Sequence, residues 1–236
     1  MTIGGNGSVG EPVPGQSHRV GAVAAIVLAG GSGRRMFPGS ESGGDKPLLA
    51  VGGRPLIAHV LERVRPQVMA LAVAVRGDPA RFARRDRALD GIALVSDPAG
   101  ESDGGGLGPL AGLLAGMEWA RAEAPYCPLL LSVPADVPFI PRDVAGRLAA
   151  HMQAIETDVL MVRSRGRLHP AVALWSTELL PDLRRALLED GIRKVEDFAR
   201  RHSVAELDWD KGGSDPFFNV NTPAELAEAD RLLGKV

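Results

Sequence analysis

The sequence predicts an α/β protein with a single doubly wound, mostly parallel sheet and helices on both faces. Apolar runs of strand length alternate with segments whose apolar residues follow helical spacing, which is typical of a parallel sheet covered by helices. The first run, residues 22–28, is apolar throughout, as expected for a strand buried on both sides. The chain of 236 residues shows no internal repeat and no second core, so we expect one domain over residues 22–236.

The elements of the first two thirds follow from this alternation. Residues 1–21 are rich in Gly, Ser and Pro and lack the pattern of a secretory signal, so we predict a disordered tail. The first helix, residues 55–64, has its apolar residues on one face, and Pro55 suits its first position. The pattern then repeats, with strands at 68–75, 92–96 and 129–133 and helices at 81–89, 109–123 and 141–152.

The last third of the domain is less regular. We expect two strands around the basic turn 163–167, then two helices; the strands are 158–162 and 171–175, and the helices 177–188 and 194–201. A closing helix at 223–233 has Thr222 as its N-cap and Glu225 as the capping-box partner. Because ligands of a doubly wound sheet bind at the carboxyl ends of its strands, the loops that follow the strands are the places to look for function.

Charge and cysteine content exclude several classes of protein. The formal net charge of −2 provides no basic field for a nucleic acid or a membrane surface. Cys127 is the only cysteine, so neither an intramolecular disulfide nor a cysteine-based zinc or iron–sulfur site can form. No run approaches the roughly 18 apolar residues of a membrane span. We therefore expect a cytoplasmic protein with no nucleic-acid and no membrane partner.

The strongest local signal is a glycine-rich turn after the first strand, Leu28-Ala29-Gly30-Gly31-Ser32-Gly33. Backbone N–H groups in such a turn can approach phosphates closely, and Arg34, Arg35 and Lys46 add positive charge for a polyphosphate. Met36 stands where a dinucleotide fingerprint needs its third glycine, and no Walker P-loop lysine follows. The turn predicts a polyphosphate site of another kind, although alone it also fits a flexible turn with solvated arginines.

Two carboxylates follow predicted strands at the same edge of the sheet. Asp136 comes just after the strand at 129–133, and Asp97 follows the strand at 92–96. Mg²⁺ prefers oxygen ligands and takes only one or two protein carboxylates beside phosphates and water, which makes Asp136 the metal-ligand candidate, with Asp97 as a possible helper. An Asp before a turn also has a purely structural use. Together with the glycine-rich turn, the two residues predict a site for a nucleoside triphosphate and magnesium.

Taken in order, the motifs resemble those of the molybdenum cofactor guanylyltransferase family, within the nucleotidyltransferases that include sugar-nucleotide pyrophosphorylases. The resemblance extends from about residue 22 to the C-terminus. It rests on residues 28–31, 34–36, 45–46, 108–112, 135–138, 169–174 and 218–226, which read LAGG, RRM, DK, GPLAG, ADVP, HPAVAL and FNVNTPAEL.

The resemblance implies a Rossmann-like fold of the nucleotide-diphospho-sugar transferase type and transfer of GMP from GTP to molybdenum-bound molybdopterin, with Mg²⁺ as cofactor. It implies transient contact with a recipient molybdoenzyme or its chaperone as well. Asp136 would hold the metal, and Lys46, Arg34 and Arg35 would act with it in catalysis. The GTP-binding residues would be Leu28, Ala29, Gly30, Gly31, Lys46, Asp97 and Asp136. Candidates for contact with the pterin or for orienting the site are His169, Asn219 and Asn221.

The chain departs from the family pattern after the second strand, where Ala74-Val75-Arg76 replaces Asn-Ala-Asn. The first asparagine of that motif is associated with the guanine nucleotide, and alanine cannot make amide hydrogen bonds. A molybdenum cofactor cytidylyltransferase or a sugar-1-phosphate nucleotidyltransferase therefore stays open, as does a nucleotide-binding chaperone that delivers the cofactor. The loop 37–44 is longer than the family leads us to expect, and we predict a mobile lid there.

Several candidates have a structural interpretation beside the functional one. His169 precedes a proline and could serve packing or a turn. Asn219 and Asn221 could orient the substrate or metal, but Asn221 also suits a helix cap. Cys127 has no visible reaction partner and is expected to be inert. The tryptophans are too scattered for a stacking platform, so we place them in the core or at its rim: Trp119, Trp175 and Trp209.

Overall fold

The computed structural model describes residues 22–31, 33, 35–37, 45–83, 86–97, 108–209 and 212–234. The tail predicted at 1–21 lies outside these ranges, as do Arg34 and all of the predicted lid except Phe37.

Seven strands form one sheet in the order β5-β4-β1-β6-β8-β7-β9. β1 pairs in parallel with β4 and β6, β4 with β5, and β7 with β9, whereas β8 is antiparallel to both β6 and β7. The mostly parallel sheet is therefore confirmed. The strands are β1 (Val23–Leu28), β4 (Ala70–Val75), β5 (Ala93–Ser96), β6 (Leu129–Pro134), β7 (Val159–Ser164), β8 (Arg167–Ser176) and β9 (Val204–Asp208).

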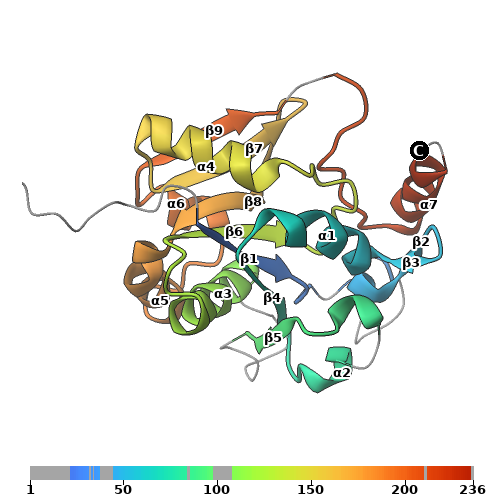
Figure 1. Cartoon of the computed structure of the whole chain (residues 1–236), viewed down its shortest axis with the longest axis horizontal. Coiled ribbons are helices and arrows are strands. Elements are labelled where there is room, and N and C mark those ends of the chain that lie inside the picture. The colour runs from blue at the N-terminus through green and yellow to red at the C-terminus, as the bar shows by residue number, and fades with distance from the viewer. Residues whose placement is uncertain are drawn as a thin grey trace, which may run out of the picture.

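Helices cover both faces of the sheet, as predicted. α1 (Leu56–Val64) and α4 (Val144–Ile155) cover one face, and α3 (Pro109–Glu123) and α5 (Leu180–Leu188) cover the other (Figure 1). Along β1, Ala25 belongs to the core on the α1 and α4 side, and Ile26 belongs to the core on the α3 and α5 side. Both faces of β1 are buried, which is why its sequence reads as one apolar run.

A small additional layer, which the alternation pattern does not predict, closes the side of the domain next to α1. The short hairpin of β2 (Ala50–Val51) and β3 (Arg54–Pro55) lies beside α7 (Pro223–Leu233), at the right of Figure 1. Gly52 N donates to Asp230 Oδ1 across this contact at 2.6 Å. The layer has its own apolar core, formed by Met36, Val51, Leu56, Val220 and Ala229. It fixes the segment that leads into α7 against the rest of the domain.

The predicted N-cap of α7 is confirmed, and Glu225 is its partner, but the return hydrogen bond of the capping box goes to the residue before the cap. Thr222 is the N-cap, and its Oγ1 accepts from Glu225 N at 3.2 Å. The Glu225 carboxylate accepts in return from Asn221 N at 2.7 Å. The Asn221 side chain is thereby left free for other contacts, because Thr222 and Glu225 complete the cap.

The predicted helix at 81–89 is wrong in extent. The structure has α2 (Ala80–Ala83) and a separate 3-10 turn at Arg87–Leu89, where the Asp86 side chain accepts from Ala88 N at 2.7 Å. This Asx-type cap begins a new turn and so breaks the helical run. The predicted helix at 141–152 is shifted and corresponds to α4, Val144–Ile155.

The predicted pair of strands around the basic turn is confirmed, but both strands are longer than expected. β7 and β8 form a hairpin whose loop is Arg165 and Gly166, both with positive φ, of 48° and 74°. The register shifts between Met161 and Val162, whose partners on β8 are Ala173 and His169. This bulge contains Pro170, which has no N–H for a ladder. His169 thus lies within β8 and not at the start of a strand.

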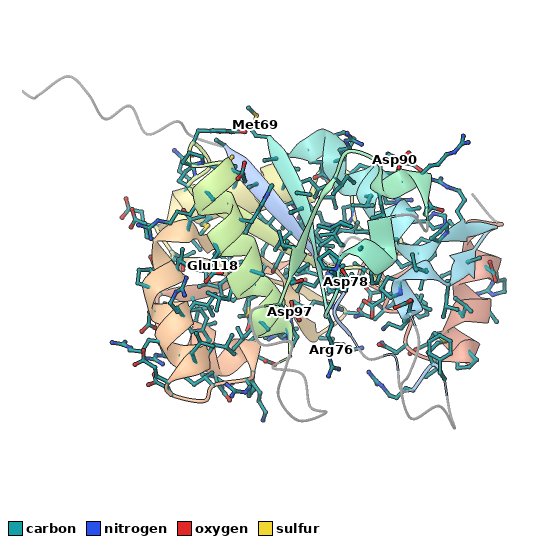
Figure 2. The ribbon with its side chains drawn as sticks, turned by 90° about the horizontal axis from the view of Figure 1, so that it is seen from below. Met69, Arg76, Asp78, Asp90, Asp97 and Glu118 are labelled. Carbon is teal, nitrogen blue, oxygen red and sulfur yellow. The ribbon has the colours of Figure 1, made fainter. Side chains whose placement is uncertain are left out.

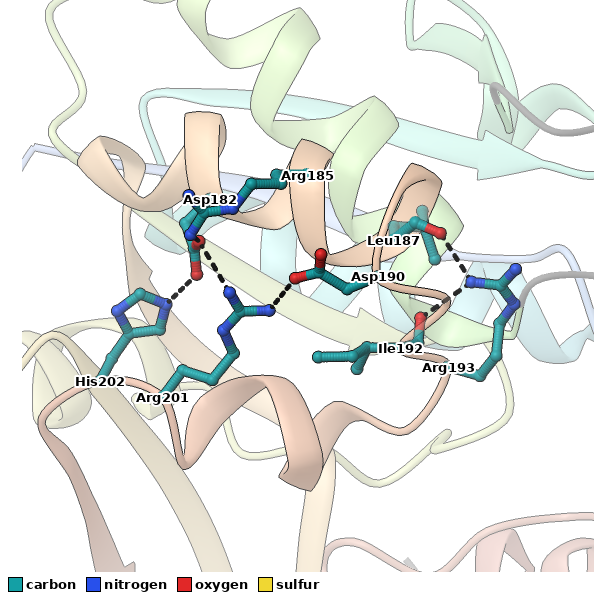
Figure 3. A network of polar contacts seen from close by, with 8 residues as sticks. All are labelled: Asp182, Arg185, Leu187, Asp190, Ile192, Arg193, Arg201 and His202. Carbon is teal, nitrogen blue, oxygen red and sulfur yellow. Dashed lines mark hydrogen bonds and ion pairs between the residues drawn. The ribbon is translucent and has the colours of Figure 1, made fainter.

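The helix predicted at 177–188 is a 3-10 turn followed by α5. The helix predicted at 194–201 is shorter than expected and corresponds to α6 (Val195–Ala199). Figure 3 shows the polar network that connects α5 with the loop after it and with the residues that follow α6. Arg201 donates to Asp182 at 3.2 Å and to Asp190 at 2.6 Å, and His202 Nε2 lies 3.1 Å from Asp182. Arg193 donates to the carbonyl of Leu187 at 2.6 Å. The network fixes the loop between the two helices, which lies against the N-cap of α3.

Gly116 of α3 allows the helix to lie close to β1. A Cβ at this position would lie 2.7 Å from Cβ of Ile26, which is fully buried. We expect Gly116→Ala to lower the free energy of unfolding by about 1–3 kcal/mol through overpacking. In the matched variant Gly146→Ala of α4, the new methyl group meets nothing within 4 Å, and helix propensity should stabilise the protein by about 1 kcal/mol or less. Urea unfolding of both variants tests this, and equal stabilities would contradict the close packing.

Candidate active site

A cavity of about 370 Å³ opens at the carboxyl ends of β1, β4, β5 and β6. This is the edge of the sheet at which the sequence predicts a ligand site. The lining residues come from the turn after β1, the start of η1 (Lys46–Leu48), the ends of β4 to β6, the first turn of α3, and the segment before α7. They include Leu28, Ala29, Gly30, Gly31, Lys46, Ala74, Arg76, Asp97, Gly108, Gly112, Asp136, Ala171 and Asn219.

The glycine-rich turn is held by backbone hydrogen bonds on both sides. Ala29 N donates to Ala74 O at 2.8 Å, and Ala135 N donates to Leu28 O at 3.0 Å. At Gly30, a Cβ would lie 2.9 Å from Asp97 Oδ2. A side chain at this position would have to move the Asp97 carboxylate from the place it occupies here.

Asp136 and Lys46 form an ion pair at one end of the cavity. The carboxylate and the ammonium are in direct contact, and their side chains are only 12% and 11% exposed. Asn219 Nδ2 donates to Asp136 Oδ1 at 3.4 Å, and Lys46 Nζ donates to Asn221 Oδ1 at 3.0 Å. Three segments far apart in the sequence therefore meet in one hydrogen-bonded cluster.

The segment before α7 is fixed directly to this cluster. Val220 N donates to the Asp136 carbonyl at 2.9 Å, so the backbone of the Asn-Val-Asn motif is paired with the Asp136 loop. The Asn221 side chain accepts from Lys46 and, at 3.4 Å, from Arg35. Of the two interpretations left open for Asn221, the structure favours orientation of the site over a side-chain helix cap.

Asp97 lies elsewhere in the cavity, beside Arg76. Figure 2 shows both side chains at the lower edge of the molecule in that view, and they follow the neighbouring strands β5 and β4. Asp97 Oδ1 is buried and has no hydrogen-bond partner among the residues that the structure describes. Burial raises the pKa of Asp97 to about 6, and the positive charge of Arg76 opposes this shift. Asp97 therefore lines the cavity with a carboxylate, one oxygen of which is buried near Gly112 of α3 without a hydrogen-bond partner among the described residues.

Asp97 and Asp136 have separate surroundings. Asp97 follows β5 and Asp136 follows β6, and both β4 and β1 lie between these two strands. The neighbours of Asp97 are Gly30 and Arg76, whereas those of Asp136 are Lys46 and Asn219. This arrangement favours different ligand groups for the two carboxylates over a shared metal ion.

Residues 25–204 match the family described as the MobA-like NTP transferase domain. The chain belongs to this family. A relative named molybdenum cofactor guanylyltransferase from Bradyrhizobium sp. (strain ORS 278) is 44% identical over 211 residues, which cover 89% of this chain and 93% of the relative. A relative of the same name from Rhodopseudomonas palustris (strain BisB5) is 46% identical over 211 residues, covering 89% and 94%. The resemblance inferred from the motifs is confirmed.

Solved structures show the same fold. Molybdopterin-guanine dinucleotide biosynthesis protein A from Archaeoglobus fulgidus superposes with a TM-score of 0.69 at 24% identity, covering 91% of this chain and 100% of that one. The 4-diphosphocytidyl-2C-methyl-D-erythritol synthase of Anaerococcus prevotii gives a TM-score of 0.68 at 13% identity, covering 93% and 100%. The nucleotide-diphospho-sugar transferase type of fold is thereby confirmed.

The donor set at Asp136 suits the divalent metal that nucleotidyltransferases of this kind generally use. A Mycobacterium tuberculosis protein of this fold, with 21% identity and a TM-score of 0.61, was solved in complex with manganese. Within the described ranges, no three His, Cys, Asp or Glu side chains gather into a metal site. A metal beside Asp136 would therefore take further oxygen ligands from its substrate, as Mg²⁺ does in phosphate-binding sites.

His169 is not among the residues that line the cavity. It is 6% exposed, its ring lies 5.4 Å from that of Phe217, and its Nε2 is 2.8 Å from Ser164 Oγ. Since the Ser164 hydroxyl donates to Asp215 at 2.7 Å, His169 must be the donor to Ser164. Burial lowers the pKa of His169, and Asp215 opposes this shift. In this conformation His169 has the packing role that the sequence left open.

Sequence reasoning did not single out Arg76 as a site residue, nor did it find Ser164 and Asp215. The signal for Arg76 was its place directly after β4, at the edge where Asp97 and Asp136 follow their strands.

Cys127 and two of the tryptophans, Trp175 and Trp209, are buried as expected, and burial raises the pKa of the Cys127 thiol. Across the described residues, no helix is long and apolar enough to span a bilayer.

Proposed function

We propose that this protein transfers a guanylyl group from GTP to molybdenum-bound molybdopterin, forming the guanine dinucleotide cofactor and releasing pyrophosphate. The observation that carries the proposal is one cavity with two different polar regions. One holds the Asp136, Lys46 and Asn219 cluster, and the other holds the carboxylate of Asp97, which makes no hydrogen bond with the part of the chain that the structure describes. A nucleoside triphosphate has the same division into an anionic chain and a polar base.

The Asp97 region suits a guanine base. An ionised carboxylate only accepts hydrogen bonds, and guanine offers two adjacent donors, N1–H and the 2-amino group. Adenine and cytosine present one amino group next to a ring nitrogen that accepts, so a carboxylate would repel part of that edge. In this proposal the wall formed by Leu28, Ala29 and Gly30 holds the ring and ribose close to the end of β1.

The Asp136 region suits the triphosphate and its metal. Asp136 would hold Mg²⁺, and Asn219 would keep the carboxylate oriented. When bound, the metal would supply positive charge to oxygens of the reacting phosphates. Lys46 is paired with Asp136 in the free protein and would turn its ammonium toward the phosphates, with Arg35 nearby through Asn221 and Arg34 next in sequence.

The transfer step requires no covalent intermediate on the enzyme. An oxygen of the terminal phosphate of the pterin attacks the α-phosphorus of GTP. The bond from this phosphorus to the bridging oxygen of the β-phosphate breaks, and pyrophosphate leaves with that electron pair. Lys46 and the two arginines would stabilise the charge that develops on the leaving group, and the cavity would hold the reactants in line.

The pterin would approach from the side of the cavity formed by Asn219 and Ala171. Asn219 belongs to the segment before α7 and Ala171 to the β8 bulge, and neither residue borders the Asp97 region that we assign to the base. His169 lies two residues before Ala171 and would support this wall from within the core. We further propose that the protein works in the reducing cytoplasm, in keeping with its single buried cysteine, and hands its product to a molybdoenzyme or that enzyme's chaperone.

A label-transfer experiment tests the proposed function. GTP labelled at the α-phosphorus should pass its label to a pterin dinucleotide, whereas label at the γ-phosphorus should appear only in pyrophosphate. If GTP binds tightly but neither product forms in the presence of the pterin and Mg²⁺, the protein is a binding and delivery factor instead. Transfer to a sugar phosphate and not to the pterin would assign it to the sugar-nucleotide branch.

Guanine binding through Asp97 should depend on pH. The pKa of Asp97 is raised to about 6, so the carboxylate gains a proton as the pH falls through 6 and loses half of its acceptor function. We expect GTP affinity to fall between pH 7 and pH 5 and Asp97→Asn to weaken binding at pH 7.5 by roughly 10- to 100-fold. Calorimetric titration of both proteins across this range measures the effect.

Asp97→Asn also controls for the titration of the GTP phosphates, because that titration affects the parent and the variant equally. Because a raised pKa means that the ionised group costs stability above pH 6, Asp97→Asn should not lower the melting temperature at pH 7.5. Parallel pH profiles for the parent and the variant would contradict the assignment of Asp97 to the base.

A further inference from the structure

We propose that Arg76 determines base specificity by donating hydrogen bonds to the O6 and N7 edge of guanine, an inference that rests on the proposed function. Among the described residues, five of the side chains that line the cavity are polar or charged, and two of these, Lys46 and Asn219, donate to a third, Asp136. The other two are Arg76 and Asp97. Within the described residues, neither side chain takes part in a hydrogen bond, so both are available to a ligand.

Arg76 and Asp97 both lie close to the glycine-rich turn, at the ends of the adjacent strands β4 and β5. A Cβ built on Gly30 would be 2.9 Å from Asp97 Oδ2 and 3.6 Å from the Arg76 Cβ. Val75 and Ser96, the residues that precede them, are register partners on β4 and β5. The two side chains therefore leave adjacent strands at the same level and border the same part of the cavity.

Their chemistry is complementary to the polar edge of one base. A guanidinium has only donors and an ionised carboxylate has only acceptors. Around the guanine ring, the donors at the 2-amino group and N1 are followed directly by the acceptors O6 and N7. A base that places its donors on Asp97 thus presents O6 and N7 on the neighbouring side, where an arginine fork can bind them as it binds guanine in DNA.

Ala74 makes this role for Arg76 possible. Ala74 lies near the end of β4 and Arg76 directly follows the strand, and both residues line the cavity. The methyl group of Ala74 cannot bond to a base and lies against α3, where a Cβ on Gly112 would be 3.3 Å away. With a small apolar residue at 74, Arg76 is the side-chain donor beside Asp97 among the described residues that line the cavity.

A phosphate group is the competing ligand for a cavity arginine, and Asp97 argues against it. A phosphate at Arg76 would face the Asp97 carboxylate, and the two negative charges would repel. The triphosphate has a more suitable place at Lys46, where Arg35 is nearby. Base contact is therefore the better match for Arg76.

Nucleotide analogues separate these roles. We would measure the affinities of the parent, Arg76→Ala and Arg76→Lys for Mg²⁺ complexes of GTP and of 7-deaza-GTP, in which a C–H group replaces the N7 acceptor. The parent should bind GTP about tenfold more tightly than the analogue. Arg76→Ala removes the contacts to both O6 and N7, whereas the analogue lacks only the N7 contact. The variant should therefore weaken GTP binding about tenfold more than it weakens binding of the analogue, and it should lose the preference for GTP. Arg76→Lys keeps the charge but lacks the fork, so it should lose most of the discrimination as well.

Arg65→Ala removes an exposed arginine away from the cavity and should behave as the parent does. If Arg76→Ala weakens the binding of GTP and of 7-deaza-GTP equally, Arg76 acts through its charge on the phosphates. If the parent protein binds the two nucleotides equally well, Arg76 does not contact N7. Either result overturns the proposal. The parent's preference for GTP over CTP and ATP tests the proposed function separately. If the parent shows no such preference, both the proposed function and the role of Arg76 are overturned. If the parent prefers GTP but Arg76→Ala binds GTP and the analogue as the parent does, only the role of Arg76 is overturned.

Discussion

Asp136→Asn will abolish metal-dependent turnover while leaving the chain folded. The carboxylate is the one ionised oxygen ligand in the Lys46 and Asn219 cluster, and an amide oxygen in its place carries no charge to hold a divalent metal. Metal ions contribute several kcal/mol of charge stabilisation in such reactions, so we expect kcat to fall on the order of 1000-fold or more. Steady-state pyrophosphate release over a range of Mg²⁺ concentrations measures this.

Asp143→Asn is the matched control for Asp136. Asp143 is exposed, stands at the N-cap of α4, and makes no side-chain cap hydrogen bond. Its substitution should leave kcat and the metal dependence unchanged. Near-normal turnover by a folded Asp136→Asn protein would remove Asp136 from the mechanism.

Lys46→Ala will lower kcat at least about 100-fold, as the loss of an electrostatic donor to the transition state does in other enzymes. The ammonium lies beside Asp136 and Asn221 at the end of the cavity that we assign to the triphosphate. Because the developing charge on pyrophosphate exceeds that of the bound triphosphate, kcat should fall more than the affinity for GTP. Rapid-quench turnover and equilibrium binding of the same variant separate the two effects.

The exposed Lys194, at the N-terminal end of α6, provides the control. Lys194→Ala should change neither quantity. A loss of less than threefold in Lys46→Ala would mean that Lys46 only neutralises Asp136 in the free protein. Loss confined to GTP affinity, with kcat intact, would assign Lys46 to ground-state binding.

The parallel half of the domain could be predicted because its signals are local. β1 is buried on both faces and reads as an apolar run, and α3 extends over the residues that its pattern predicts, Pro109–Glu123. By contrast, β9 is an edge strand whose residues Val204, Glu206 and Asp208 are exposed, so its sequence does not resemble a buried strand. The β2–β3 hairpin has too few residues to give a pattern.

The site could be predicted as a set of residues but not as an arrangement. Strand ends that share an edge bring Asp97, Asp136 and the glycine-rich turn together by topology alone. The contacts of Asn219 and Asn221 with Asp136 and Lys46 depend on the path of the segment before α7, which no local pattern encodes. The burial of His169 depends likewise on the bulge at Pro170, where a proline interrupts the ladder between β7 and β8.

The central claim is tested most directly by pyrophosphate release with molybdopterin and Mg²⁺, with GTP, CTP and ATP supplied separately and the dinucleotide product identified. The account predicts release with GTP and formation of the guanine dinucleotide, with CTP and ATP close to background. Release with CTP in place of GTP would contradict the roles given to Asp97 and Arg76. Silence with all three nucleotides, from a protein that is folded and binds GTP, would contradict guanylyl transfer itself.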